Sequence, residues 1–584
     1  MVYKKKTIFS LFSSGGMSFF IPDYQRAYSW EKEQCEQFFN DLYEQSKSEN
    51  NYYLGNIIVE KNNFQLEIVD GQQRMTTVII FIRAFINICS ERMKSEKNKI
   101  NLSELKKKYI GSSGNLKLNP CKIDRDYFEA LIINNKSIQT KSQSQEKIKY
   151  AKNYFIRKLK TIKLFSELLK ILEKLQESII TITTIDDKTD SAFMFELMNN
   201  RGRVLTEMER VKAYLMYQIY INDKKSSVKN KIKKISMLFG EIYLFLNDIK
   251  NINEDDLLWY HCNAYYGYCY IDDNYDTIVE FLKEQINEIT EKPKKIEFIS
   301  NFVKELRQTF SDIHEMEKSK NIGYLKRICL LGIPRNLYPF IINGYRYMKK
   351  DDKIKYFEKL FHLLELLSFR LEIIPRNGNV KLNKRFDNIL NFQGDINTLY
   401  KGIRSNFIDD ENEYRWTDDA MYEVLRGPVF KKVTDNAIHY IFKIYENKIS
   451  GGDFPKLKKI SIEHISPQTF PPPNVKDTGY EKLPKKNDYS IKFKNQYLHC
   501  IGNLMLSAGK QQNELSNKKF VEKLKIYNQN KLGLKHQTEL KKYFENSKKV
   551  KWGIAEIEKR RNALIDFIFE QWSFRNKDKY FLVT

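Results

Sequence analysis

The stretch Asp70-Gly71-Gln72-Gln73-Arg74 stands at an abrupt change in the pattern of this sequence. It follows a strand-like run over residues 65–69 and precedes an apolar, helix-like run over residues 75–89. A glycine turn between a strand and a helix start brings backbone N–H groups and a guanidinium to one point, which suits the binding of phosphate. The N-terminal part of the chain is therefore predicted to be a mixed α/β domain with a phosphate-binding turn.

The composition favours a large protein with a polyanionic partner. The chain has 584 residues, of which 42% are hydrophobic and 14% aromatic, so it can bury several cores. Lys and Arg number 99 against 74 Asp and Glu, and the formal net charge of +25 favours nucleic acid over a membrane surface. Part of this excess reflects a bias toward Lys, Asn and Ile of the kind that AT-rich genomes produce.

Cysteine usage and hydropathy indicate a cytoplasmic protein. Seven cysteines without a C-x-x-C pair argue against a disulfide framework or a structural zinc site. His261, Cys262 and Cys269 lie close together, but their spacing fits no standard zinc module. The apolar run after the lysines at 4–6 is broken too early for a signal peptide. No run of about 18 apolar residues occurs, so no membrane span is expected.

The remaining pattern predicts an α+β protein that is predominantly helical. Strands are expected within an N-terminal domain of residues 1–215, over 18–21, 53–60, 65–69 and 178–185. Thr206 followed by Glu209 is a capping-box signature, which predicts that a helix begins there. Residues 216–410 carry helical periodicity almost throughout and form the predicted middle region. Residues 411–584 form the last predicted domain.

Three further segments share the chemistry of the Asp70–Arg74 stretch. Each combines apolar anchors with Gln, Asn or Arg, which orient and neutralise phosphate oxygens; they cover residues 21–30, 53–59 and 195–212. We predict that Arg26 and Arg74 neutralise the charge of phosphate. The carboxylate of Asp70 is predicted to orient a metal ion or water. Gln72 and Gln73 are expected to position phosphate or water. The chain has no Walker-type sequence, so any nucleotide hydrolysis here is not of the P-loop type.

Together these segments resemble the N-terminal ParB-like domain of the GmrSD-type, modification-dependent (type IV) restriction family. The resemblance covers roughly residues 10–215 and implies a nucleotide-hydrolysing module that senses DNA and governs a nuclease. It implies GTP or another nucleoside triphosphate as the cofactor, with Asp70 also catalytic. By position, the implied nucleotide pocket consists of Gln25, Arg26, Asp70, Gly71, Gln72, Gln73, Arg74, Asn200 and Arg201.

A second chemical site is predicted at Glu463-His464. Residues 460–468 alternate like a strand, residues 497–506 read as a second strand, and a helix is expected from about residue 517. This order resembles an HNH, or ββα-metal, nuclease. Phosphodiester cleavage needs a base that is active near neutral pH, and an unperturbed histidine has a pKa of about 6.5. It also needs a divalent ion on oxygen ligands.

The residue types around this pair suit that chemistry. His464 is the expected base, and Glu463 and Asn513 are the expected ligands of Mg²⁺ or Mn²⁺. Asn517 is a rival to Asn513, because the gap between Asn503 and Asn513 is one residue longer than the family pattern.

Other residues are expected to support this site or to bind DNA. Asn503 is predicted to hold the loop together through its amide, and His499 is predicted to be structural on its apolar strand. The helix that follows carries lysines that are predicted to contact the DNA backbone, namely Lys518, Lys519 and Lys523.

The C-terminal part resembles the nuclease half of the same restriction family over roughly residues 410–575. The resemblance also rests on residues 552–557, Arg561, Leu564 and Trp572. The predicted function is anti-phage defence by a nucleotide-regulated, metal-dependent HNH endonuclease acting on double-stranded DNA, either phage DNA or modified DNA. A second copy of the chain, in a homo-oligomer, is a further candidate partner. The alternative is a nucleotide-switched, ParB-like DNA-binding protein with a vestigial nuclease site, and a weaker one is an RNase.

Overall fold

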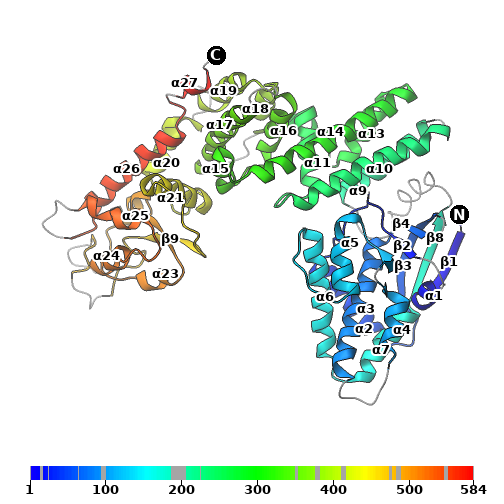
Figure 1. The fold of residues 1–584 in the computed structure, drawn as a ribbon. Coiled ribbons are helices and arrows are strands. Elements are labelled where there is room, and N and C mark those ends of the chain that lie inside the picture. Colours follow the sequence, from blue (N-terminus) through cyan, green and yellow to red (C-terminus); the bar gives the residue numbers. More distant parts are fainter. Residues whose placement is uncertain are drawn as a thin grey trace. The chain divides into compact units, whose positions relative to one another are not determined.

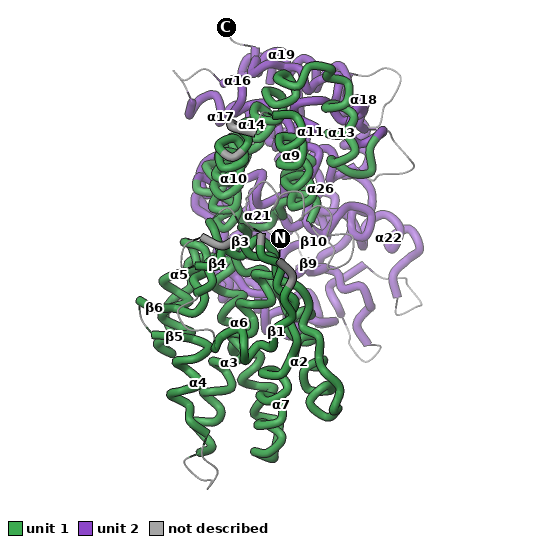
Figure 2. The backbone as a smooth tube through the Cα atoms, turned by 90° about the vertical axis from the view of Figure 1, so that its right-hand side faces the viewer, with its two compact units in different colours: residues 1–261, 275–318 green, residues 262–274, 319–584 purple. Residues whose placement is uncertain are grey.

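The chain forms two compact units, which are described separately (Figure 2). In the computed structural model, unit 1 comprises residues 1–261 and 275–318, and unit 2 comprises residues 262–274 and 319–584. The structure describes all residues except 1, 14–17, 24, 63–64, 94–99, 113, 186–205, 224, 349–352, 375–381, 410–415, 473–476, 482–487, 545–549, 576 and 583–584.

A six-stranded mixed sheet organises the N-terminal part of unit 1 (Figure 1). Its strand order is β1-β8-β3-β4-β2-β7. The central strand β3 pairs in parallel with β8 and antiparallel with β4. The strands are β1 (Val2–Thr7), β2 (Ser18–Phe20), β3 (Tyr53–Asn62), β4 (Gln65–Asp70), β7 (Leu118–Asn119) and β8 (Ile179–Ile185), and a separate hairpin pairs β5 (Gly111–Ser112) with β6 (Asn115–Leu116).

Helices cover this sheet and extend beyond it. The helix α3, which begins two residues after β4, is buried over nearly its whole surface and packs against α4 and α6. The helices of unit 1 are α1 (Ile8–Ser13), α2 (Lys32–Gln45), α3 (Gln72–Arg92), α4 (Leu102–Tyr109), α5 (Lys122–Phe128), the π-helix η1 (Glu129–Ile133), α6 (Gln143–Thr161), α7 (Phe165–Glu177), α9 (Glu207–Asn222), α10 (Lys225–Asp248), α11 (Glu254–Tyr266, ending in unit 2), α13 (Ile278–Glu288) and α14 (Lys292–Ser319, also ending in unit 2).

The local signals in the first half of the chain are largely confirmed. The strands predicted near residues 18, 53, 65 and 178 are present, and α9 begins after Thr206 with the predicted capping box. The Thr206 backbone N–H donates to Glu209 Oε2 at 3.0 Å, and the Glu209 N–H donates to Thr206 Oγ1 at 3.2 Å. The edge strand β1 was not predicted. Its lysines are typical of a protected sheet edge, and so they hide the strand pattern.

Among its described residues, unit 2 is helical apart from turns, loops and one small antiparallel pair of strands. The strands are β9 (Ile460–His464) and β10 (Leu504–Ala508). The α-helices are α12 (Tyr268–Ile271), α15 (Gly323–Leu331), α16 (Tyr338–Tyr347), α17 (Lys353–Ile373), α18 (Leu382–Leu390), α19 (Ile396–Ile403), α20 (Asp418–Arg426), α21 (Asp435–Ser450), α22 (Ile491–Gln496), α23 (Lys510–Leu515), α24 (Phe520–Asn528), α25 (Lys535–Thr538), α26 (Ile554–Trp572) and α27 (Asp578–Phe581). Shorter turns are the 3-10 helices η3 (Arg335–Leu337), η7 (Ile501–Asn503) and η8 (Glu539–Tyr543), and the π-helix η5 (Arg404–Ile408).

The fold class is confirmed as α+β and predominantly helical. The division between the units falls inside the predicted helical middle, residues 216–410, and the limits of the three domains stay a prediction. The strand predicted over residues 497–506 is wrong in its first half, because β10 begins only at Leu504, after η7. In the part of the chain that the structure describes, no helix has both the length and the apolarity needed to cross a bilayer.

Candidate functional sites

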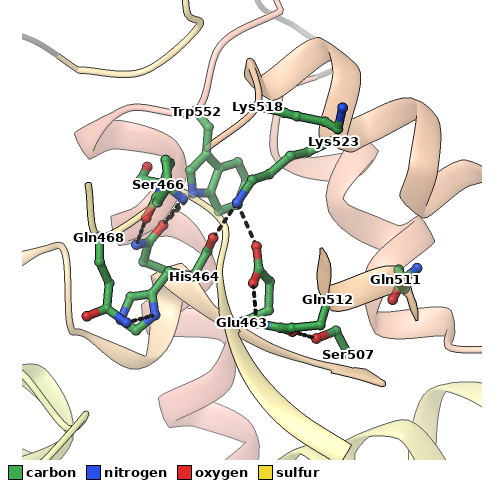
Figure 3. A network of polar contacts seen from close by, with 12 residues as sticks. Glu463, His464, Ser466, Gln468, Ser507, Gln511, Gln512, Lys518, Lys523 and Trp552 are labelled. Atoms are coloured by element: carbon green, nitrogen blue, oxygen red, sulfur yellow. Dashed lines mark hydrogen bonds and ion pairs between the residues drawn. The ribbon is translucent and has the colours of Figure 1, made fainter. Parts of the chain in front are cut away.

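The Glu463-His464 pair lies at the end of β9, beside a cleft of about 180 Å³ (Figure 3). In the register of the two strands, His464 is opposite Leu504 and Glu463 is opposite Met505. Both side chains are almost fully buried but border the cleft. The cleft is lined by Ile462, Glu463, His464, Pro467, Gln468, Thr469, Gln512, Ser516, Asn517 and Lys523.

Asn503 ties the segment after His464 to its surroundings. This fully buried residue accepts hydrogen bonds through Oδ1 from the Ser466 N–H (2.9 Å) and from the Trp552 indole (3.1 Å). Its Nδ2 donates to the carbonyls of Ser466 (3.1 Å) and Leu498 (2.9 Å). The Asn503 amide therefore joins the backbone at Ser466 to the backbone at Leu498, which is 32 residues further along the chain. The position suits the supporting role assigned to Asn503.

His464 has a polar neighbour at each ring nitrogen. Its Nε2 lies 3.1 Å from Nδ1 of His499, and its Nδ1 lies 3.4 Å from Nε2 of Gln468. Burial, with contributions from His499, Lys523 and Lys431, lowers the pKa of His464 to about 3. The imidazole is therefore neutral at neutral pH. Its basicity is lower than that of the unperturbed histidine expected from the sequence, because burial disfavours the charged ring.

Glu463 forms a buried ion pair with Lys523. The Lys523 ammonium lies 2.6 Å from Glu463 Oε1 and donates to the His464 carbonyl at 2.8 Å, and Gln512 donates to Glu463 Oε2 at 3.1 Å (Figure 3). Burial raises the pKa of Glu463 and lowers the pKa of Lys523, and their mutual attraction opposes both shifts.

This pairing corrects the prediction that Lys523 contacts DNA. Its side chain is fully buried and its ammonium is held by protein oxygens, because position 523 lies on the buried face of α24 with Phe520 and Tyr527. Lys518 is exposed and Lys519 is half-buried at the start of the same segment, so a DNA contact by these two lysines stays a prediction.

The glycine of the Asp70–Arg74 stretch is required by its backbone conformation. Gly71 has φ +89° at the N-cap of α3, and a Cβ there would lie 2.6 Å from the side chain of Ile57. The α3 helix therefore starts immediately after β4, at Gln72, as the strand–turn–helix pattern predicts. Asp70 is the last residue of β4 and is half-buried.

The glutamines of this stretch bind the backbone of residues 25–29. Gln72 donates to the Arg26 carbonyl (3.2 Å), and Gln73 donates to the Ala27 carbonyl (3.1 Å) and accepts from the Ser29 N–H (2.8 Å). In return, Gln25 donates to the Val69 carbonyl (2.8 Å). These amides thus join two of the predicted motif segments, and they hold protein backbone in the places where phosphate or water was predicted.

The two arginines of the predicted nucleotide pocket have protein partners. Arg74 donates to the Asn56 carbonyl at 2.9 Å and fills the space that a side chain at Gly55 would need. Arg26 lies 3.2 Å from Glu254, which is 3% exposed, so part of its charge is already balanced. Asn200 and Arg201, the last two predicted pocket residues, lie outside the described residues.

Comparison with protein families covers both sites. Residues 6–216 match the model of the N-terminal domain of the GmrSD restriction endonuclease, and residues 416–567 match the model of the C-terminal domain of GmrSD restriction endonucleases. The chain belongs to the GmrSD restriction endonuclease family. It is accordingly a DNA-cleaving hydrolase of phage defence. A search of curated proteins found no match.

Within this GmrSD chain, sequence reasoning missed Asp124. It borders the same small cavity as Gln72, Gln73 and Arg26, although it lies about fifty residues from the glutamines and about a hundred from Arg26 in sequence. The Ser144 hydroxyl donates to Asp124 at 2.5 Å and the Tyr28 N–H donates at 3.3 Å, while burial raises its pKa to about 6. No local signal marks this aspartate, because it stands inside the ordinary helix α5.

The cleft beside His464 offers a metal ion one carboxylate and one side-chain amide. Among the described residues, no three His, Cys, Asp or Glu side chains gather where they would hold an ion. Glu463 and Asn517 border the same cleft, whereas Asn513 is exposed and is not among the cleft residues. One carboxylate, one amide and room for water fit a magnesium-type ion, which retains several of its waters. Such an ion would compete with Lys523 for the Glu463 carboxylate.

Proposed function

We propose that this GmrSD protein cleaves double-stranded phage or modified DNA with a metal-dependent, HNH-type site at His464, under the control of a nucleotide bound by its N-terminal domain. The observation that carries the nuclease part is the placement of the His464 imidazole at the edge of a cleft that is also lined by Glu463 and Asn517. The order β9, β10 and α24 supports the HNH assignment.

The chain's own residues supply the proton chemistry. His464 takes a proton from the water that attacks phosphorus, because its imidazole borders the cleft. Asn503 keeps the base in place by fixing Ser466, two residues further along the chain. Glu463 and Asn517 would hold Mg²⁺ or Mn²⁺, which stabilises the charge on the leaving oxygen when bound.

Cleavage assays with the full chain test this function. Plasmid DNA, phage DNA and RNA are incubated with Mn²⁺, with Mg²⁺ or with EDTA, each with and without GTP. The proposal expects cutting of DNA that EDTA stops and that GTP alters. Binding of DNA without cutting on every substrate would favour the nucleotide-switched DNA-binding protein, and preferential cutting of RNA would favour an RNase.

Substitution of Asn517, but not of Asn513, is expected to weaken metal binding. Both side chains are exposed, but Asn517→Ala removes one that borders the cleft, whereas Asn513→Ala removes one on α23 that does not. Mn²⁺ affinity, measured by calorimetry in the absence of DNA, should fall about tenfold in the first variant and stay unchanged in the second. The opposite ranking would restore Asn513 as the ligand.

Replacement of Arg74 is expected to impair the nucleotide site. Loss of one charge-assisted hydrogen bond to phosphate should weaken GTP binding about tenfold or more, measured with a fluorescent GTP analogue. Arg92→Ala is the matched control, because Arg92 also binds carbonyls but stands at the other end of α3. Asp70→Ala should slow GTP hydrolysis, measured as the release of inorganic phosphate. Unchanged binding and hydrolysis in both variants would remove the nucleotide assignment.

A further inference from the structure

A second histidine contacts the proposed base. His499 lies in the turn before η7, and its Nδ1 is 3.1 Å from Nε2 of His464. The two rings are perpendicular, with their centroids 5.2 Å apart. The sequence predicts His499 as a structural residue on an apolar strand. The strand placement is wrong, because β10 begins five residues later, and the turn brings the ring to His464.

Phe430 holds the two histidines in this arrangement. Its ring stacks on His499, with an interplanar angle of 16°, and meets the His464 ring edge-on at a centroid distance of 4.7 Å. Its backbone N–H donates to the His499 carbonyl at 3.1 Å. Phe430 therefore contacts both rings, and its stacking on His499 restricts the orientation of that ring.

The hydrogen bonds favour one tautomer of His464. With the Gln468 amide nitrogen facing Nδ1 of His464, that ring nitrogen is the acceptor. A neutral imidazole has one N–H, which is then on Nε2 and donates to Nδ1 of His499. The lone pair of His464 Nδ1 consequently points to Gln468, which lines the cleft.

We infer that His499 is a positioning residue for the nuclease reaction. By accepting the Nε2–H of His464, it keeps the basic Nδ1 directed to the cleft, where the attacking water would take the place of the Gln468 amide. A catalytic base that is oriented by a third group is a recurring arrangement in hydrolases. The inference rests on the proposed role of His464 as the base, and the experiment below separates the two.

Two substitutions of His499 distinguish a role in hydrogen bonding from a role in packing. His499→Phe keeps a ring to stack on Phe430 but has no acceptor, whereas His499→Asn keeps an acceptor oxygen near the Nδ1 position but has no ring. Positioning through the hydrogen bond predicts a kcat about ten- to a hundredfold lower for the Phe variant, with most of the loss recovered in the Asn variant. KM for DNA should change less than twofold. A packing role predicts the reverse ranking.

The assay is single-turnover cleavage of plasmid DNA by the full chain with Mn²⁺, with thermal unfolding measured for each variant. His439→Phe serves as the control, because His439 is on α21 and does not line the cleft. If Phe is as active as wild type, or if Asn is no better than Phe, the inference is overturned while the nuclease assignment stands. If His464→Ala itself still cuts, the proposed base is wrong.

Discussion

Replacement of His464 by alanine is expected to reduce DNA cleavage by about 10²- to 10⁴-fold, the usual contribution of a general base. The imidazole is neutral, borders the cleft and is oriented by its hydrogen bond to His499. The fold should persist, because the His464 carbonyl that binds Lys523 remains in the variant. Single-turnover cleavage of plasmid DNA with Mn²⁺ measures the loss.

Two controls make this result specific. Hydrolysis of GTP by the same preparation should be unchanged, because His464 belongs to unit 2 and the proposed nucleotide site belongs to unit 1. Mn²⁺ affinity should also stay close to that of wild type if Glu463 and Asn517 are the ligands. Cleavage within tenfold of wild type would show that another group accepts the proton.

Replacement of Lys523 by methionine is expected to destabilise unit 2 by about 3–5 kcal/mol, the usual cost of removing one partner from a buried ion pair. The ammonium is fully buried and lies 2.6 Å from Glu463, so its loss leaves a buried carboxylate without a counter-charge. Urea denaturation followed by tryptophan fluorescence measures the change, since Trp552 is buried close to this site.

The matched control is Lys525→Met, an exposed lysine on the same helix, which should stay within about 0.5 kcal/mol of wild type. Adding Glu463→Gln to Lys523→Met should restore most of the lost stability, because the unpaired charge disappears. Mn²⁺ should stabilise the Lys523→Met variant more than wild type, since no ammonium then competes for the carboxylate. A loss below 1 kcal/mol without metal would show that Glu463 does not depend on Lys523.

Some side chains of the sites could be located only through their tertiary partners. Lys523 reads as a surface lysine in a basic segment, yet it is the counter-charge of a glutamate sixty residues earlier in the chain. Likewise, Asp124 and His499 carry no local signal of their positions beside Gln72 and His464. Periodicity and turn chemistry report contacts within a few residues, whereas these partners are 35 or more residues apart.

The sequence by itself determined the class of the fold, the turn at Gly71, the helix start at Thr206 and the strand that carries Glu463-His464. Each of these depends on local backbone preferences and short-range hydrogen bonds. Only the tertiary structure decided that the amides of Gln72 and Gln73 hold backbone, that Lys523 is buried, and that Asn517 rather than Asn513 borders the cleft. Burial and charge pairing depend on which distant segments pack together, and that is a property of the folded chain.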